Sequence, residues 1–111
     1  MADVQQVFAA NGPLPLKTSV QIQSNMPAVV TLAGSVWSNA ANQQIGIALL
    51  IDGEVVAMAT IFANPASTHL SVVPLEFPFT FEIGPHDFTL NPLNNATTSD
   101  KNDFYCVTVQ Y

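Results

Sequence analysis

Three oxygen-bearing side chains stand close together near the end of the chain, and their spacing is the clearest indication of chemistry in the sequence. Asp100, Asn102 and Asp103 fall within four positions, directly after the polar run 97–99. Carboxylate and amide oxygens held in one loop can accept hydrogen bonds from sugar hydroxyls or supply ligands to calcium. The same residues also fit an Asx turn that starts the last strand, so both alternatives stay open.

One aromatic side chain has polar neighbours that suit the same chemistry. Trp37 is the only tryptophan, and Ser38 and Asn39 follow it at the end of an expected strand. An indole in this position can stack on the face of a sugar, and it can equally be an anchor of the core or of an interface. The ligand-binding residues that we predict are Trp37, Asn39, Asp100, Asn102 and Asp103.

The histidines do not form a catalytic or metal-binding motif. His69 and His86 are the only two, and their spacing fits neither His-Glu-x-x-His nor a paired-histidine strand motif. His86 and Asp87 follow a Gly-Pro pair, which favours a solvated turn over a turn-borne site. A nucleophile elbow is also missing. We therefore expect a protein that is not an enzyme and has no cofactor or metal, with calcium at the loop oxygens as the one alternative.

The charge of the chain excludes two classes of partner. The net charge is −6, Lys17 and Lys101 are the only basic residues besides the histidines, and there is no arginine. Binding to nucleic acid or to anionic lipid depends on cationic side chains that neutralise phosphates. We expect no nucleic-acid partner and no insertion into a membrane, since no apolar run approaches the roughly 18 residues that span a bilayer.

Length and cysteine content favour one domain that comprises residues 1–111. A chain of 111 residues can bury a single core without covalent cross-links. Cys106 is the only cysteine, so an internal disulfide is excluded, and we expect it to be a buried apolar residue of the last strand. The first residues do not resemble a secretion signal, which favours a cytoplasmic protein or release by a non-classical route.

Short β-strands are the elements that must position these residues. Asp52 and Gly53 separate two apolar runs within 45–62, the strongest local signal for a tight hairpin, and the first run is apolar on both faces, which predicts cover on both sides. Residues 77–83 place Phe77, Phe79, Phe81 and Ile83 on one face as a wall of the core, while Pro78 confines that part of the strand to an edge or a bulge. Further strands are expected at 18–23, 28–38, 69–75, 87–90 and 103–111, a polar loop at 91–102, and helical spacing only at 3–10.

About eight short strands between proline- and glycine-containing turns predict an all-β protein, an antiparallel β-sandwich of the jelly-roll type. The segments FPFTFEI, GPHDFTL and NDFYCVTVQY of the C-terminal half resemble the second half of TNF/C1q-like jelly rolls, which include bacterial lectins and phage receptor-binding heads. In such families the closing aromatic strand often lies near a trimer axis. The resemblance implies an oligomer interface at Phe104, Tyr105 and Tyr111, with a trimer favoured.

The scarcity of charge points to association on physical grounds as well. Only 9% of the residues are charged, against about 25% in an average soluble domain. A small domain with so few charges exposes amides, hydroxyls and apolar groups, and closed symmetric association would cover part of that surface. Two functions remain: a homo-oligomeric, lectin-like module that binds carbohydrate or a cell-surface ligand, and a structural subunit of a particle, coat or appendage without a small-molecule ligand.

Overall fold

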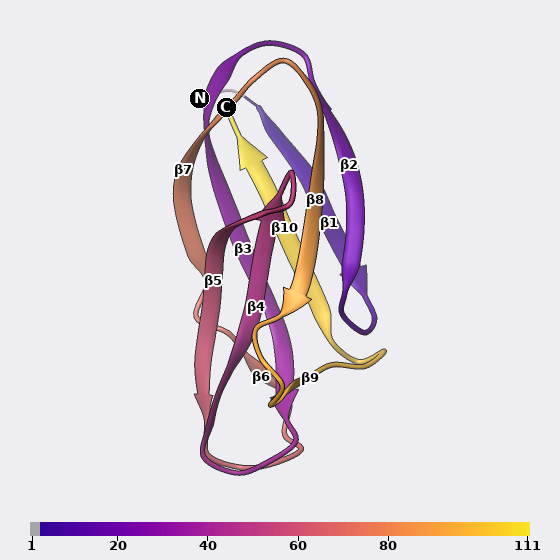
Figure 1. Ribbon diagram of the computed structural model, residues 1–111, viewed down its shortest axis with the longest axis vertical. Helices are drawn as coiled ribbons and strands as arrows, with labels where there is room; N and C mark the ends of the chain where they lie inside the picture. Colours follow the sequence, from indigo (N-terminus) through magenta and orange to yellow (C-terminus); the bar gives the residue numbers. More distant parts are fainter. Residues whose placement is uncertain (1–2) are drawn as a thin grey trace.

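The computed structural model describes residues 3–111, which form two antiparallel β-sheets stacked face to face in an elongated molecule measuring 45 × 21 × 20 Å (Figure 1). Residues 3–111 contain no helix, and thus none with the length and apolarity that a bilayer crossing needs. The strands are β1 (Val4–Asn11), β2 (Leu16–Ile22), β3 (Met26–Ser38), β4 (Gln43–Ile51), β5 (Glu54–Ala63), β6 (Leu70–Ser71), β7 (Leu75–Phe81), β8 (Gly84–Pro92), β9 (Thr97–Thr98) and β10 (Phe104–Gln110).

The order of the strands is that of a jelly roll. One sheet contains β1, β10, β3 and β7, with the short strands β6 and β9 paired to the end of β3, and the other contains β2, β8, β4 and β5. Successive long strands alternate between the sheets, except that β4 and β5 form a hairpin within one sheet. This connectivity confirms the predicted all-β sandwich of the jelly-roll class.

The hairpin of β4 and β5 forms where the Asp-Gly pair predicts it. Asp52 and Gly53 both have positive φ, 53° and 85°, as a two-residue turn that matches the twist of the strands requires. In β4, Ile45, Ile47 and Leu49 are fully buried, and the intervening residues are buried as well. The prediction that this strand is covered on both sides is therefore confirmed.

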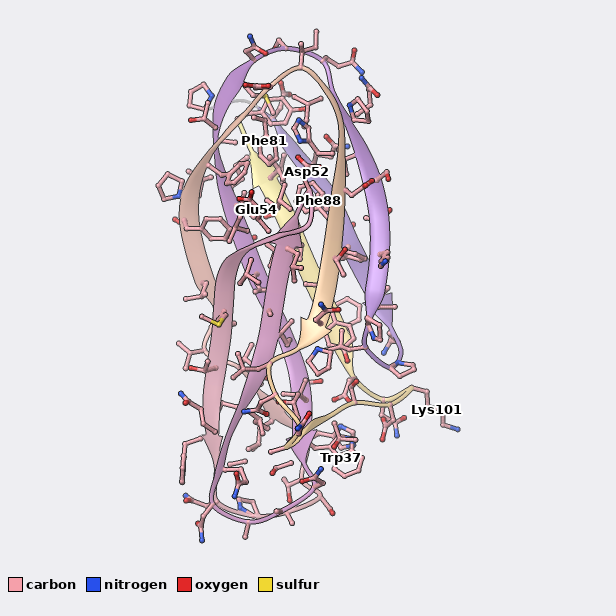
Figure 2. All side chains as sticks on the ribbon, in the orientation of Figure 1. Trp37, Asp52, Glu54, Phe81, Phe88 and Lys101 are labelled. Atoms are coloured by element: carbon pink, nitrogen blue, oxygen red, sulfur yellow. The ribbon has the colours of Figure 1, made fainter. Side chains whose placement is uncertain are left out.

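The core lies between the sheets and is built by the inward-facing residues of each strand. Its largest fully buried side chains are Tyr105, Phe81 and Phe88. Phe81 and Phe88 lie toward one end of the sandwich (Figure 2), where their ring centroids are 6.0 Å apart. Because alternate residues of a strand face opposite sides of a sheet, β10 buries Tyr105, Val107 and Val109 and turns the residues between them outward.

Five local predictions differ from the structure. Residues 3–10 form most of a β-strand rather than helix, because β1 pairs with β10. The expected strand 69–75 is reduced to β6, since this segment crosses from one sheet to the other, and the polar loop 91–102 contains β9. Ile83 lies beyond the end of β7 and is exposed. Cys106 is half-buried on the outer face of β10 instead of lying in the core.

The edge position of the proline-containing strand is confirmed. β7 pairs only with β3, and Pro78 stands opposite Val29 in that register. A proline at a sheet edge sacrifices no hydrogen bond to a neighbouring strand on its free side. Of the four large apolar residues predicted to form a wall of the core, only Phe81 is fully buried, while Phe77 and Phe79 pack at its margin.

Candidate functional site

Three segments that are distant in the sequence meet at one end of the sandwich. The longest strand, β3, extends beyond its pairing with β7, and its last residues pair with β6 on one side and with β9 on the other. Val36 stands opposite Leu70, and Trp37 stands opposite Thr98. The long strand therefore brings the start of β6 and the loop before β10 together beside Trp37 (Figure 2).

Asp103 connects these segments through its two carboxylate oxygens. Its Oδ1 accepts hydrogen bonds from the Ser35 hydroxyl (2.8 Å) and from Nδ1–H of His69 (2.7 Å), and its Oδ2 accepts the backbone N–H of Asp100 (2.8 Å). The side chain is fully buried. A buried carboxylate needs hydrogen bonds and positive charge nearby, and in residues 3–111 no lysine forms an ion pair with it. His69 is the group that can supply that charge.

His69 combines one occupied nitrogen with one that faces solvent and a second carboxylate. The hydrogen bond with Asp103, together with the charges of Asp103 and Asp100, raises the pKa of His69 above its usual 6.5, while partial burial opposes the shift. Its Nε2 lies 3.6 Å from Oδ2 of Asp100, and both side chains are roughly 40% exposed, 38% and 41%. This separation exceeds the range of a good hydrogen bond.

The loop oxygens adopt the turn that the sequence offered as an alternative. Oδ1 of Asp100 accepts the backbone N–H of Asn102 at 2.8 Å, which is an Asx turn. Asp100 thus uses one oxygen for the turn and presents the other toward His69. Asn102 contributes only its backbone to this arrangement, and its side chain is exposed. The structure therefore brings together Asp100 and Asp103 of the predicted set, with the carboxylate of Asp103 turned inward.

Trp37 lies beside His69, with ring centroids 6.1 Å apart and the planes inclined by 51°. Its indole Nε1 is buried and has no hydrogen-bond partner in residues 3–111. Asn39 is exposed in the next loop, where its Nδ2 donates to the backbone carbonyl of Asn95. The structure places Trp37 next to the cluster and gives Asn39 the task of joining two loops.

A second set of hydrogen bonds fastens the loop before β10 to the other sheet. The Asn94 amide donates to the carbonyl of Gln44 (2.7 Å), and the Thr97 hydroxyl donates to Oδ1 of Asn94 (2.8 Å). Thr97 also accepts the N–H of Gly46 at 3.2 Å. A Cβ on Gly46 would lie 2.2 Å from the carbonyl oxygen of Ala59, so only glycine fits here. These contacts hold the loop that carries Asp100 and Asp103.

A cleft of about 340 Å³ adjoins the cluster on the outer face of the β1–β10–β3–β7 sheet. It lies between β3, the connection from β6 to β7 and the start of β10, with the exposed ring of Phe104 on one side and the residues Ser35 and Ser71 among its lining. Ser35 belongs to both features, because its hydroxyl also donates to Asp103. The cleft thus combines an aromatic surface with hydroxyl groups, and Ser35 connects it through Asp103 to the cluster that includes the partly exposed carboxylate of Asp100.

His86, the second histidine, forms a different arrangement near the opposite end of the sandwich, where Asp52 lies (Figure 2). Its Nδ1 bonds to Oδ2 of Asp52 (2.6 Å) and its Nε2 to the carbonyl oxygen of Glu82 (2.7 Å). The carbonyl of Glu82 raises the pKa of His86 most, Asp52 adds to the shift, and burial opposes it. Burial raises the pKa of Asp52, but the hydrogen bond from the Asp87 N–H and the interaction with His86 outweigh it, so the pKa is lowered. The predicted solvated turn is wrong, because His86 and Asp87 lie within β8 and pair with β2.

The residues predicted at an oligomer interface have different environments. Tyr105 is fully buried between the sheets, so its assignment to an interface is wrong; the alternation along β10 directs it inward. Its buried hydroxyl has no hydrogen bond of regular geometry, and burial raises its pKa to about 12. Phe104 and Tyr111 are exposed near opposite ends of β10, and their role at an interface stays a prediction.

Sequence reasoning missed the participation of His69. It lies 34 positions before Asp103, and no local spacing links the two. The signal that could have found it is the pairing of β6 with the end of β3, which depends on the length of β3 rather than on a motif.

Comparisons with known proteins define a fold class. No family model matches the sequence, and no curated protein is similar to it in sequence. Similar solved structures include a family 35 carbohydrate-binding module from Clostridium thermocellum (TM-score 0.54, 8% identity, 89% of this chain and 71% of that one) and a sugar-binding protein, the EclA C-terminal domain (0.52, 14%, 97% and 77%). A β-glucosidase from Paenibacillus barengoltzii matches over 97% of this chain and 10% of its own (0.57, 14%). At these identities the likeness is one of fold, and the TNF/C1q-like resemblance stays a prediction beyond the jelly-roll class.

Proposed function

We propose that this protein binds carbohydrate without catalysing a reaction, and that the sugar occupies the cleft beside Phe104. The observation that carries the proposal is the position of this cleft, which adjoins the His69–Asp100–Asp103 cluster through the shared residue Ser35. An aromatic ring and several fixed oxygens around one concavity are the combination that sugar recognition uses, because a sugar offers both apolar C–H faces and hydroxyl groups.

Different residues of the cleft would contact the C–H face of a sugar and its hydroxyl groups. The Phe104 ring, which is 46% exposed, supplies the stacking surface. The Ser71 hydroxyl lines the cleft and can exchange hydrogen bonds with sugar hydroxyls, and a sugar that extended past Ser35 toward the cluster would meet the exposed carboxylate of Asp100. A volume of about 340 Å³ is at the small end of ligand pockets, roughly 300–1,000 Å³, and favours one or two sugar units over a long segment of polysaccharide.

The comparisons support this proposal at the level of the fold. Two of the similar structures are described as a carbohydrate-binding module and a sugar-binding protein. Fold alone does not assign function, so the proposal depends on the residues of this cleft.

A glycan array with the purified chain tests the proposal, with one arm containing calcium and one containing a chelator. We expect binding that is lost in Phe104→Ala and weakened in Asp100→Asn, while Met58→Ala, which also truncates an exposed apolar side chain but lies on β5, keeps it. Thermal unfolding of each variant shows whether it is folded. Silence of the folded wild-type chain across the array, or binding that survives Phe104→Ala, would contradict the proposal.

Self-association has support from a different surface. β5 is an edge strand that pairs only with β4, and its exposed residues include Val55, Met58 and Phe62. The Val73 N–H donates to the Thr60 carbonyl and covers part of β5, while the exposed apolar residues elsewhere on the strand favour contact with another chain, as expected for a homo-oligomer or for a structural subunit of a particle or coat. We propose a homo-oligomer on this basis, with a trimer as the predicted form. A concentration-independent species of 11.9 kDa in sedimentation would contradict it.

A further inference from the structure

We propose that Nε2 of His69 and Oδ2 of Asp100 form a two-ligand site for a divalent transition-metal ion of the Zn²⁺ class, and that Asp103 orients His69 for it. One ligand atom each of His69, Asp100 and Asp103 lies within 4.8 Å of the others. The proposal goes beyond carbohydrate binding, because it concerns a metal ion alone and holds whether or not the cleft takes a sugar.

The separation of the two ligand atoms is that of an ion pair, and it is also compatible with a shared metal ion. Nε2 and Oδ2 are 3.6 Å apart, which is too long for a hydrogen bond. Zinc binds histidine nitrogen and carboxylate oxygen at about 2.0–2.2 Å, and two such bonds at an angle of about 110–120° place the ligand atoms about 3.4–3.6 Å apart. The side chains are therefore already at the distance that one bound ion requires.

Asp103 prepares His69 for this role. It accepts the proton of Nδ1 at 2.7 Å, so that Nε2 carries the lone pair once the ring gives up its second proton, as it does on binding a metal ion. Histidines that ligate metals commonly donate their other N–H to a carboxylate, which fixes the tautomer and the orientation of the ring. Ser35 and the N–H of Asp100 hold Asp103 in turn, so the imidazole is attached to a buried and fully engaged carboxylate.

The charge and access of the site also fit a cation. Two carboxylates converge on His69, and no lysine in residues 3–111 forms an ion pair with them. Lys101, which belongs to the same loop, projects away from the sandwich (Figure 2). His69 and Asp100 are 38% and 41% exposed, so an ion can reach them from solvent.

The ligand types select among metals. Imidazole nitrogen suits Zn²⁺, Ni²⁺ and Cu²⁺, whereas Ca²⁺ takes six to eight oxygen ligands. The oxygens of Asp103 are engaged by Ser35, His69 and the Asp100 N–H, and Oδ1 of Asp100 is engaged by Asn102. This arrangement leaves one carboxylate oxygen next to one nitrogen, which does not favour the calcium alternative derived from the sequence.

Isothermal titration of ZnCl₂ into the purified chain at neutral pH tests the proposal. We expect one ion per chain, loss of that binding in His69→Ala, and affinity at least about tenfold lower in Asp100→Asn and in Asp103→Asn. The matched control is His86→Ala, because both nitrogens of His86 are occupied, by Asp52 and by the Glu82 carbonyl. A Cys106→Ser variant must keep the site, which separates it from zinc capture by the half-buried thiol.

Nitrogen NMR of the His69 ring distinguishes a positioning role of Asp103 from a merely structural one. In the wild type we expect the proton on Nδ1 and a zinc-induced shift at Nε2, and in folded Asp103→Asn a mixture of tautomers. Absence of stoichiometric zinc binding to the wild type, its persistence in His69→Ala, or its loss in His86→Ala would overturn the proposal. Glycan binding measured with a chelator is independent of these results, so the two proposals fail separately.

Discussion

Two histidine–aspartate pairs lie near opposite ends of this sandwich, and they differ in how many of the histidine nitrogens are hydrogen-bonded. His86 has a partner on each ring nitrogen, Asp52 on one and the Glu82 carbonyl on the other, and its ring packs edge-on against Phe81 at 5.3 Å. His69 has a hydrogen-bond partner on Nδ1 only, and its Nε2 lies 3.6 Å from Oδ2 of Asp100. An imidazole with both nitrogens hydrogen-bonded to the protein contributes to the stability of the fold. An imidazole with one nitrogen not hydrogen-bonded, next to a carboxylate, can also bind a ligand.

The surroundings of the two histidine–aspartate pairs also differ. His86 packs against Phe81, whose ring in turn contacts Phe79 and Phe88, and Phe81 and Phe88 belong to the core. His69 lies beside Trp37, whose buried Nε1 has no hydrogen-bond partner in residues 3–111, and Asp103 connects His69 to Ser35 at the cleft. Unsatisfied polar groups are costly, and they are more often retained where a ligand or function requires them.

The largest effect should come from the aromatic cluster. Phe81→Ala removes a fully buried ring, and we expect it to lower the free energy of unfolding by about 3–5 kcal/mol. Trp37→Ala, at the other end, truncates a half-buried ring and should cost clearly less. Urea denaturation of both variants measures the difference, and equal losses would break the distinction between a structural and a functional end.

Removal of the buried carboxylate should have the next largest effect. Asp103→Ala leaves the Ser35 hydroxyl, the Asp100 N–H and His69 without their acceptor, and should cost about 2–3 kcal/mol of unfolding free energy. Asp52→Ala removes a carboxylate that is 49% exposed, so water replaces its bonds and the cost should be nearer 1 kcal/mol. A larger loss of unfolding free energy in Asp52→Ala than in Asp103→Ala would contradict the conclusion that Asp103 is the more buried and more strongly hydrogen-bonded carboxylate.

A smaller effect, of opposite sign, is expected at Tyr105. Tyr105→Phe removes a buried hydroxyl that lacks a regular hydrogen bond, so stability should stay unchanged or rise by up to about 1 kcal/mol. Tyr111→Phe is the control, since Tyr111 is exposed. Thermal unfolding compares the two, and a clear loss of stability in Tyr105→Phe would show that the contact of this hydroxyl with Ser99 is a stabilising hydrogen bond.

The smallest effect concerns pH. Both histidines have a raised pKa in the folded chain, so each contributes stability that is fully present below the unfolded value, about 6.5, and is lost as the pH rises through the folded value. For the 38%-exposed His69 this should amount to less than about 1 kcal/mol. The less exposed His86 should give the stronger dependence.

Urea denaturation at pH 5.5 and 8.5 checks both histidines. His69→Ala and His86→Ala should each reduce stability more at the lower pH, and the difference should be larger for His86→Ala. A greater pH dependence in His69→Ala would mean that His69 is the more strongly engaged side chain, contrary to the comparison.

Much of the fold follows from local sequence, and the site does not. Asp52-Gly53 fixes the hairpin because this pair adopts positive φ readily, and the alternation in β10 correctly groups Tyr105 with Val107 and Val109. The same alternation contradicted the interface role that family resemblance implied for Tyr105. Local periodicity should have taken precedence there.

The position of His69 depends on long-range pairing that no local pattern encodes. β3 extends past β7 and recruits β6, and this brings His69 to a carboxylate 34 positions away. The polar loop could be identified as a source of oxygens from Asp100 and Asp103, but which oxygen faces the protein and which faces solvent is decided by Ser35 and by the Asx turn. These are tertiary contacts, which cannot be predicted from the composition of the chain.

Amide NMR of the ¹⁵N-labelled chain, titrated with the glycan that gives the strongest array signal, tests the central claim most directly. The account predicts that the shifted resonances surround the cleft, at residues 33–35, 69–72 and 103–106, and that those near Asp52 and His86 do not move. Shifts concentrated around Asp52 and His86, or along β5, would contradict it.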